Sequence, residues 1–160
     1  MKSIIVDANL LCLIVAGQSA PNAIGRHKRL KAFTLDDYKR VMEICSLFST
    51  AITCPNVLTE VSNLLANTNN DEKSILLNGL ADLIERMNEN HVHSFVACAH
   101  PIFSRLGLTD AVLLCIEIED CALLSVDLDL VLAAQAAGKT VVNYNWIRDQ
   151  KITLESLGIH

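Results

Sequence analysis

Short runs of β-forming residues alternate with longer helical patterns along this chain of 160 residues. The predicted strands cover residues 3–6, 51–53, 121–126 and 140–144. Helical patterns separate them, and a helix-length crossover between neighbouring strands is typical of a parallel sheet. The sequence therefore predicts an α/β fold, an α/β/α sandwich in which helices cover both faces of a parallel sheet. In such sheets, ligands bind at the carboxyl ends of the strands.

The predicted helices are recognised by apolar residues at helical spacing and by their start and stop signals. They cover residues 8–16, 34–49, 55–68, 70–90, 109–119 and 128–138. Gly17, Pro21 and Gly25 predict a loop over 17–33, and 92–97 is either a short edge strand or an extended connection. Without repeats or low-complexity segments, residues 1–160 are expected to form a single domain with a basic insertion at about 17–35.

Composition narrows the class of protein. Hydrophobic residues make up 51% of the chain and the mean hydropathy is +0.34, which argues against disorder. Acids interrupt every long apolar run, so we expect no membrane span, and no signal-peptide pattern precedes the first strand. The expected location is the cytoplasm. Six cysteines without a C-x-x-C pair fit reduced core thiols, and we interpret His91, His93 and His100 as surface or strand residues more readily than as metal ligands.

Acidic residues recur where predicted strands end or helices begin. Asp7 follows the first strand, and Asp127 follows 121–126, with Asp129 two residues later. Glu60 lies near the start of the helix at 55–68, and Asp110 opens the helix at 109–119. Because the carboxyl ends of parallel strands share one edge of the sheet, we expect these acids to converge there.

Such convergence is costly unless a cation compensates for it. Like charges at close range raise one another's pKa, and Mg²⁺ or Mn²⁺ favours carboxylate oxygens. A bound metal of this kind can activate water for attack on a phosphodiester. Each acid also has an ordinary role open to it, since Asp7 and Asp110 suit helix caps, Glu60 a solvated helix face and Asp127 a turn. Their joint placement favours the metal site.

The motifs VDANLL, LTEVSNLL, LTDAVLL and SVDLDL, in this order, resemble the acidic motifs of PIN-domain ribonucleases. The resemblance covers residue 3 to about residue 144. It implies endonucleolytic cleavage of RNA that depends on Mg²⁺ or Mn²⁺. The acidic positions that match are Asp7, Glu60, Asp110 and Asp127, with Asp129 as an assisting metal ligand. Asn9 and Ser125 match the polar positions that orient the carboxylates.

Many short members of this family are VapC-type toxins, which implies an antitoxin protein as a partner and leaves a homodimer open. Residues 17–50 form a longer and more basic segment than the compact toxin pattern. Within it, we expect Arg26, Lys28, Arg29 and Lys31 to hold RNA phosphates that the acids repel. The alternative for this segment is a solvated basic loop. The net charge of −5 argues against a generally basic nucleic-acid binder but allows a local patch.

Other α/β classes fit less well. A haloacid-dehalogenase-type phosphotransferase would have a second aspartate where this chain has Asn9, and a response-regulator receiver would have a lysine after the last strand. The chain has neither G-x-G-x-x-G nor a P-loop, and no G-x-S-x-G. The alternative that stays open is a PIN-like module that binds RNA or protein without cleaving.

Overall fold

Five parallel strands form one sheet in the computed structural model, which describes residues 2–150 and residue 156. The strands are β1 (Ser3–Val6), β2 (Thr50–Thr53), β3 (Asn88–Glu89), β4 (Cys121–Ser125) and β5 (Thr140–Asn143). Their order in the sheet is β3-β2-β1-β4-β5, and every pair is parallel. The predicted α/β class with a parallel sheet and interleaved helices is confirmed.

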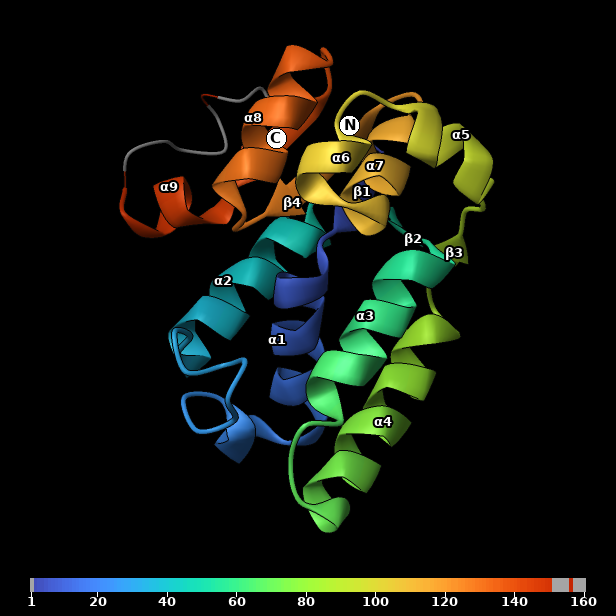
Figure 1. Ribbon diagram of the computed structural model, residues 1–160. Helices are drawn as coiled ribbons and strands as arrows, with labels where there is room; N and C mark the ends of the chain where they lie inside the picture. The colour runs from blue at the N-terminus through green and yellow to red at the C-terminus, as the bar shows by residue number, and fades with distance from the viewer. Residues whose placement is uncertain (1, 151–155, 157–160) are drawn as a thin grey trace.

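Helices lie on both sides of this sheet. They are α1 (Ala8–Ser19), η1 (Pro21–Ala23), α2 (Leu35–Ser46), α3 (Pro55–Leu65), α4 (Asn70–Ile84), α5 (Ser94–Ala99), α6 (Phe103–Leu106), α7 (Leu108–Cys115), α8 (Leu128–Ala136) and α9 (Tyr144–Arg148). In Figure 1 the strands lie in a row between α1–α4 on one side and α5–α8 on the other. The sheet order reverses at β1, because the chain moves from β1 to β2 and β3 on one side and places β4 and β5 on the other.

Helix α1 is the centre of the larger helical layer. Almost all of its side chains are buried, as expected of a helix that is apolar all round and packed on every side. It contacts α2, α3 and α4. Gly17 leaves room for α2, since a Cβ there would lie 2.2 Å from Cδ2 of Tyr38. The prediction that a loop begins at residue 17 is wrong, because this packing continues α1 to Ser19.

The segment between α1 and α2 is firmly attached to the rest of the domain. Leu30 and Phe33 are buried in the core. Thr34 and Asp37 form a capping box that begins α2, and the hydroxyl of Tyr144 donates a 2.7 Å hydrogen bond to Oδ1 of Asp37. Burial opposes ionisation of Asp37, but these hydrogen bonds outweigh it and hold the pKa of the carboxyl below its ordinary value. The basic residues are therefore carried by a loop with fixed ends.

The chain between β2 and β4 differs most from the prediction. The edge strand is β3, where the predicted helix 70–90 has already ended, since Asn88 and Glu89 pair with β2. Within residues 92–97, Val92 and His93 form a connection, but the rest is helical because α5 begins at Ser94. In α5, Phe95 and Val96 are exposed while Ala97 is fully buried. Buried and exposed residues therefore do not alternate along this segment as they would in a strand.

Helix α7 ends at Cys115, four residues before its predicted end. The acids that follow it would be unfavourable at the negative end of a helix dipole. Among the described residues, no helix is both long and apolar enough to cross a membrane.

Candidate active site

The reversal point of the sheet brings two acidic residues together. Asp7 follows β1 and Asp127 follows β4, and these strands are direct neighbours in the sheet. Ligands of open α/β sheets bind at this type of position, outside the carboxyl ends of the strands on either side of the reversal.

Asp7 is a buried carboxylate with three hydrogen-bond donors. Its Oδ1 accepts from the backbone N–H of Leu10 at 2.9 Å, which caps α1. Its Oδ2 accepts from the backbone N–H of Val126 at 3.1 Å and from the hydroxyl of Ser125. Burial nevertheless raises the pKa of Asp7 above its ordinary value, and the charge of Asp127 adds to the effect. Asp7 therefore links β1 to the end of β4 through hydrogen bonds, and ionisation of its buried carboxyl group costs free energy.

Ser125 links the two acids. While its hydroxyl donates to Asp7, its oxygen accepts a 2.9 Å hydrogen bond from the backbone N–H of Asp127. Asp127 caps α8 with Oδ1 alone, accepting from the N–H groups of Asp129 at 2.9 Å and Leu130 at 3.2 Å. Its Oδ2 takes no hydrogen bond from any residue that the structure describes. Asp127 is exposed, so this oxygen is available to a ligand.

Asp110 belongs to α7, which lies on the opposite side of the sheet from α1–α4. Gly107 has φ of +90°, which favours glycine, and it makes the sharp turn between α6 and α7. Asp110 then lies in the first turn of α7. Burial raises the pKa of Asp110 to about 7, with further contributions from the charges of Asp127, Glu60 and Asp7. The four carboxylates thus act on one another electrostatically.

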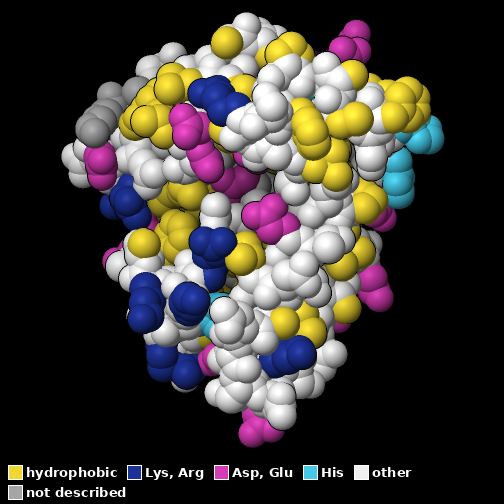
Figure 2. Space-filling view, viewed as in Figure 1, with side chains coloured by type: hydrophobic (Ala, Val, Ile, Leu, Met, Phe, Trp, Pro, Cys, Tyr) yellow, Lys and Arg dark blue, Asp and Glu magenta, His cyan; other side chains and the backbone are white. Residues whose placement is uncertain are grey.

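These four acids line one cavity of about 170 Å³. Glu60 reaches it from α3, five residues after Pro55 begins that helix. Asn9, Leu106, Leu108, Thr109 and Leu130 are also part of the wall. Figure 2 shows acidic side chains around a hollow near the middle of the face. The structure therefore places Asp7, Glu60, Asp110 and Asp127 around one cavity, and Asn9, which was singled out by the motif resemblance, also lines it.

The carboxylates do not form a closed metal cage. Over residues 2–150, no three His, Cys, Asp or Glu side chains lie close enough together to hold a metal ion by themselves. Mg²⁺ is usually held by one or two carboxylates and keeps several waters, so an open cavity walled by acids fits it better than it fits Zn²⁺. Of the three histidines interpreted above as surface or strand residues, His93 packs against Phe95, His100 accepts a hydrogen bond from the backbone N–H of Ile102, and His91 lines a neighbouring groove.

Asp129 lies outside the cavity wall. Its side chain is 67% exposed and one carboxylate oxygen lies 3.9 Å from Nη1 of Arg105 on α6. Two residues along a helix point in different directions, and because Asp127 faces the cavity as the cap of α8, Asp129 faces away. Its predicted role as a metal ligand receives no support from this position.

The basic residues divide into two groups. Arg26 forms an ion pair with Glu72, which also accepts a hydrogen bond from Thr68, so Arg26 attaches the loop to α4. The side chains of Lys28, Arg29 and Lys31 are exposed. Figure 2 shows Lys and Arg side chains gathered over the segment between α1 and α2, on the same face as the acidic hollow.

The charge of Arg29 acts on the same buried thiol, Cys12, as the charges of two of the acids. Burial raises the pKa of the Cys12 thiol on α1 to about 12, Arg29 counteracts this shift, and Asp7 and Glu60 add to it. Arg29 and the acids therefore act on the same buried group. Lys28 and Arg29 also line a cavity of about 230 Å³ with the buried His27, whose Nε2 has no hydrogen-bond partner within the described structure.

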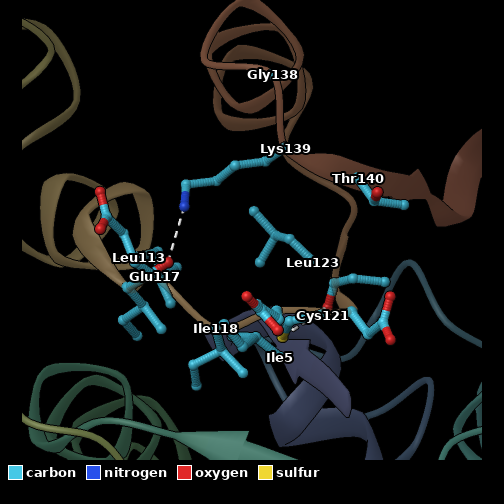
Figure 3. A pocket seen from close by; sticks show the side chains of 13 residues that line it. Ile5, Leu113, Glu117, Ile118, Cys121, Leu123, Gly138, Lys139 and Thr140 are labelled. Carbon is cyan, nitrogen blue, oxygen red and sulfur yellow. Dashed lines mark hydrogen bonds between the residues drawn. The ribbon is translucent and has the colours of Figure 1, made fainter. Parts of the chain in front are cut away.

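A larger cavity lies at the opposite edge of the sheet. It measures about 580 Å³ and lies at the amino-terminal ends of β4 and β5, beside the end of α7. In Figure 3, Lys139 extends across it, and its Nζ donates a 2.8 Å hydrogen bond to the carbonyl of Ile116. This lysine satisfies the carboxyl-terminal end of a helix. Since the strand ends that carry the acids lie at the other edge of the sheet, the volume of this cavity does not make it the active-site candidate.

Sequence reasoning missed Thr109, an uncharged residue of the wall. Thr109 lines the acidic cavity and also an adjoining groove with Asn56 and Asn63. Its position directly before Asp110 was the available signal.

No known protein family matches this sequence, and no curated protein matches it either.

Proposed function

We propose that this protein is a metal-dependent endoribonuclease with a PIN-like active site. The observation that carries the proposal is the convergence of Asp7, Glu60, Asp110 and Asp127 around one cavity at the reversal point of the sheet. Their order along the chain and their motif context resemble those of PIN-domain nucleases. The raised pKa of Asp7 and of Asp110 supports a site adapted to bind a cation, because structural carboxylates are normally stabilised by their partners.

Asp127 and Asp110 are the residues best suited to hold Mg²⁺ or Mn²⁺. Asp127 offers an uncommitted oxygen, and no hydrogen bond to Asp110 occurs within the described residues. Asp7 has three donors and is buried, so it supplies negative charge and a fixed geometry. A bound metal would supply a water of lowered pKa and neutralise charge on the phosphodiester. Glu60 is half-buried at the rim, where it can orient water or accept its proton.

The basic loop supports RNA as the substrate. An acidic cavity repels phosphates, so a nuclease of this design needs cations close by to hold the strand. Lys28 and Arg29 are exposed on a loop with fixed ends, and the charges of Arg29, Asp7 and Glu60 all act on the Cys12 thiol of α1. The motif resemblance also supports the toxin of a toxin–antitoxin pair as the biological setting, with an antitoxin protein as the partner.

The test is cleavage of a labelled single-stranded RNA by the purified protein in Mg²⁺, in Mn²⁺ and in EDTA. The proposal requires internal cleavage with either metal and none in EDTA. RNA that binds in EDTA but is not cut in either metal would favour the alternative, a PIN-like binding module without catalysis.

A further inference from the structure

A groove of about 570 Å³ adjoins the acidic cavity. Glu60, Leu108 and Thr109 line both spaces, so the two lie side by side. The volume lies in the range of small-molecule sites. An RNA strand with one phosphate over the carboxylates would therefore place a neighbouring nucleotide in the groove.

The wall of the groove is polar but almost uncharged. Helix α3 contributes Asn56, Thr59 and Asn63, the segment after β3 contributes His91 and Ser94, and α7 contributes Thr109. Neither Lys nor Arg is among the described residues that line it, and Glu60 adds a negative charge. The groove is therefore unsuited to a phosphate and suited to a neutral group with several hydrogen-bonding atoms.

The hydrogen-bonding capacity of these side chains is unused. Within the described structure, none of the six makes a side-chain hydrogen bond to protein. Some residues of the same types are engaged elsewhere, as Thr34, Asn69 and Asn143 accept hydrogen bonds from backbone N–H groups as helix caps. Two amides, three hydroxyls and an imidazole thus face one groove with their donors and acceptors free.

We propose that this groove binds an unpaired nucleobase next to the phosphate that is cut, and that Asn63 and His91 set the nucleotide preference. The inference rests on the proposed nuclease function. An amide presents both a donor and an acceptor, which matches the edge of a base, and His91 adds a ring on which a base can stack. In duplex RNA these edges are occupied, so the substrate is single-stranded at the cleavage site.

The experiment maps cleavage of an RNA pool that is randomised around a fixed position. Its readout is the ratio of cleavage at the most and least preferred flanking nucleotide. Asn63→Ala and His91→Ala should each lower this ratio about tenfold, which corresponds to the ~1.4 kcal/mol of one hydrogen bond. Two matched controls lie outside the groove, Asn78→Ala on α4 and His93→Ala, and they should leave the ratio unchanged.

A binding arm separates this inference from the nuclease proposal. Fluorescence anisotropy in EDTA compares four eight-nucleotide RNAs, each of a single base type. If the wild type discriminates among them and Asn63→Ala does not, the groove binds bases whether or not RNA is cut. Groove variants that keep the wild-type ratio, or a wild type without flanking preference in either assay, would overturn the inference while leaving metal-dependent cleavage intact.

Discussion

Replacing Asp110 by Asn should stabilise the protein when metal is removed. An Asp in the unfolded chain titrates near 3.8, whereas burial and the neighbouring acids raise the folded pKa of Asp110 to about 7. Each pKa unit corresponds to ~1.36 kcal/mol, so the full shift amounts to ~4 kcal/mol. Asp110 is partly exposed, and solvent screening reduces the gain to ~1–2 kcal/mol. For a domain of this size, that raises the melting temperature by ~3–6 °C.

The dependence on pH follows from the direction of the shift. Because the folded pKa is higher, the protonated group stabilises the fold at low pH, and this contribution is lost as the pH rises from about 4 to about 7. The advantage of Asp110→Asn should therefore be small at pH 4.5 and largest at pH 8. Asn keeps the size of the side chain, and no hydrogen bond of Asp110 is lost within the described structure.

The assay is a set of melting curves in EDTA and in millimolar Mg²⁺ or Mn²⁺, with Asp82→Asn on the exposed face of α4 as the matched control. Metal should reverse the order, since the wild type gains ~2.7 kcal/mol at a hundredfold excess of metal over its dissociation constant. The reasoning would be refuted by an Asp110→Asn variant that melts below the wild type in EDTA at pH 8, or that gains as much from metal.

Three further predictions concern the surroundings of the site. Lys28→Glu and Arg29→Glu should each weaken RNA binding in EDTA and lower the slope of log K against log salt by ~0.7 or more. Lys2→Glu, at the far end of β1, should change neither the affinity nor the slope. Equal slopes for all proteins would show that the loop does not contact the RNA. Ser125→Ala should lower the free energy of unfolding by ~1–3 kcal/mol in chemical denaturation, because it removes a hydrogen-bond donor from the buried carboxylate that follows β1. It should also weaken metal binding ~10–100-fold, because Ser125 positions that carboxylate. Unchanged metal affinity would contradict this positioning role. Gly17→Ala should destabilise by ~1–3 kcal/mol, since its Cβ would overlap the tyrosine ring of α2, and a melting curve like that of the wild type would show that the ring moves aside.

Much of the fold could be predicted because its strands are short, buried and bounded by clear signals. The strands β1, β4 and β5 occur within one residue of their predicted ranges. The acids at their ends followed from the rule that parallel strands share a carboxyl edge. This rule needs only the order of elements, so the strand-end positions of Asp7 and Asp127 could be inferred without knowledge of side-chain packing.

Features that depend on tertiary contacts could not be predicted. Residues 92–97 have the β-branched and aromatic composition of a strand, but from Ser94 onward they form α5, which packs on the core through Ala97. Arg26 lies in the same basic stretch of sequence as Lys28, but Arg26 forms an ion pair with Glu72, which is distant in the sequence. Glu72 belongs to a helix that lies 46 residues away in the sequence, and nothing in the local pattern indicates the pairing.

The central claim is that the acidic cavity cuts RNA, and the most direct measurement compares single-turnover cleavage rates of the wild type and Asp127→Asn. Asn can accept the same backbone hydrogen bonds as the cap of α8, so the fold and purification should not change. Both proteins should be prepared identically and assayed in Mn²⁺, so that any contaminating ribonuclease contributes equally to each rate. We predict that the variant retains the far-ultraviolet circular dichroism of the wild type and cuts RNA at least ~100-fold more slowly. Equal rates would show that the cavity is not the site of cleavage.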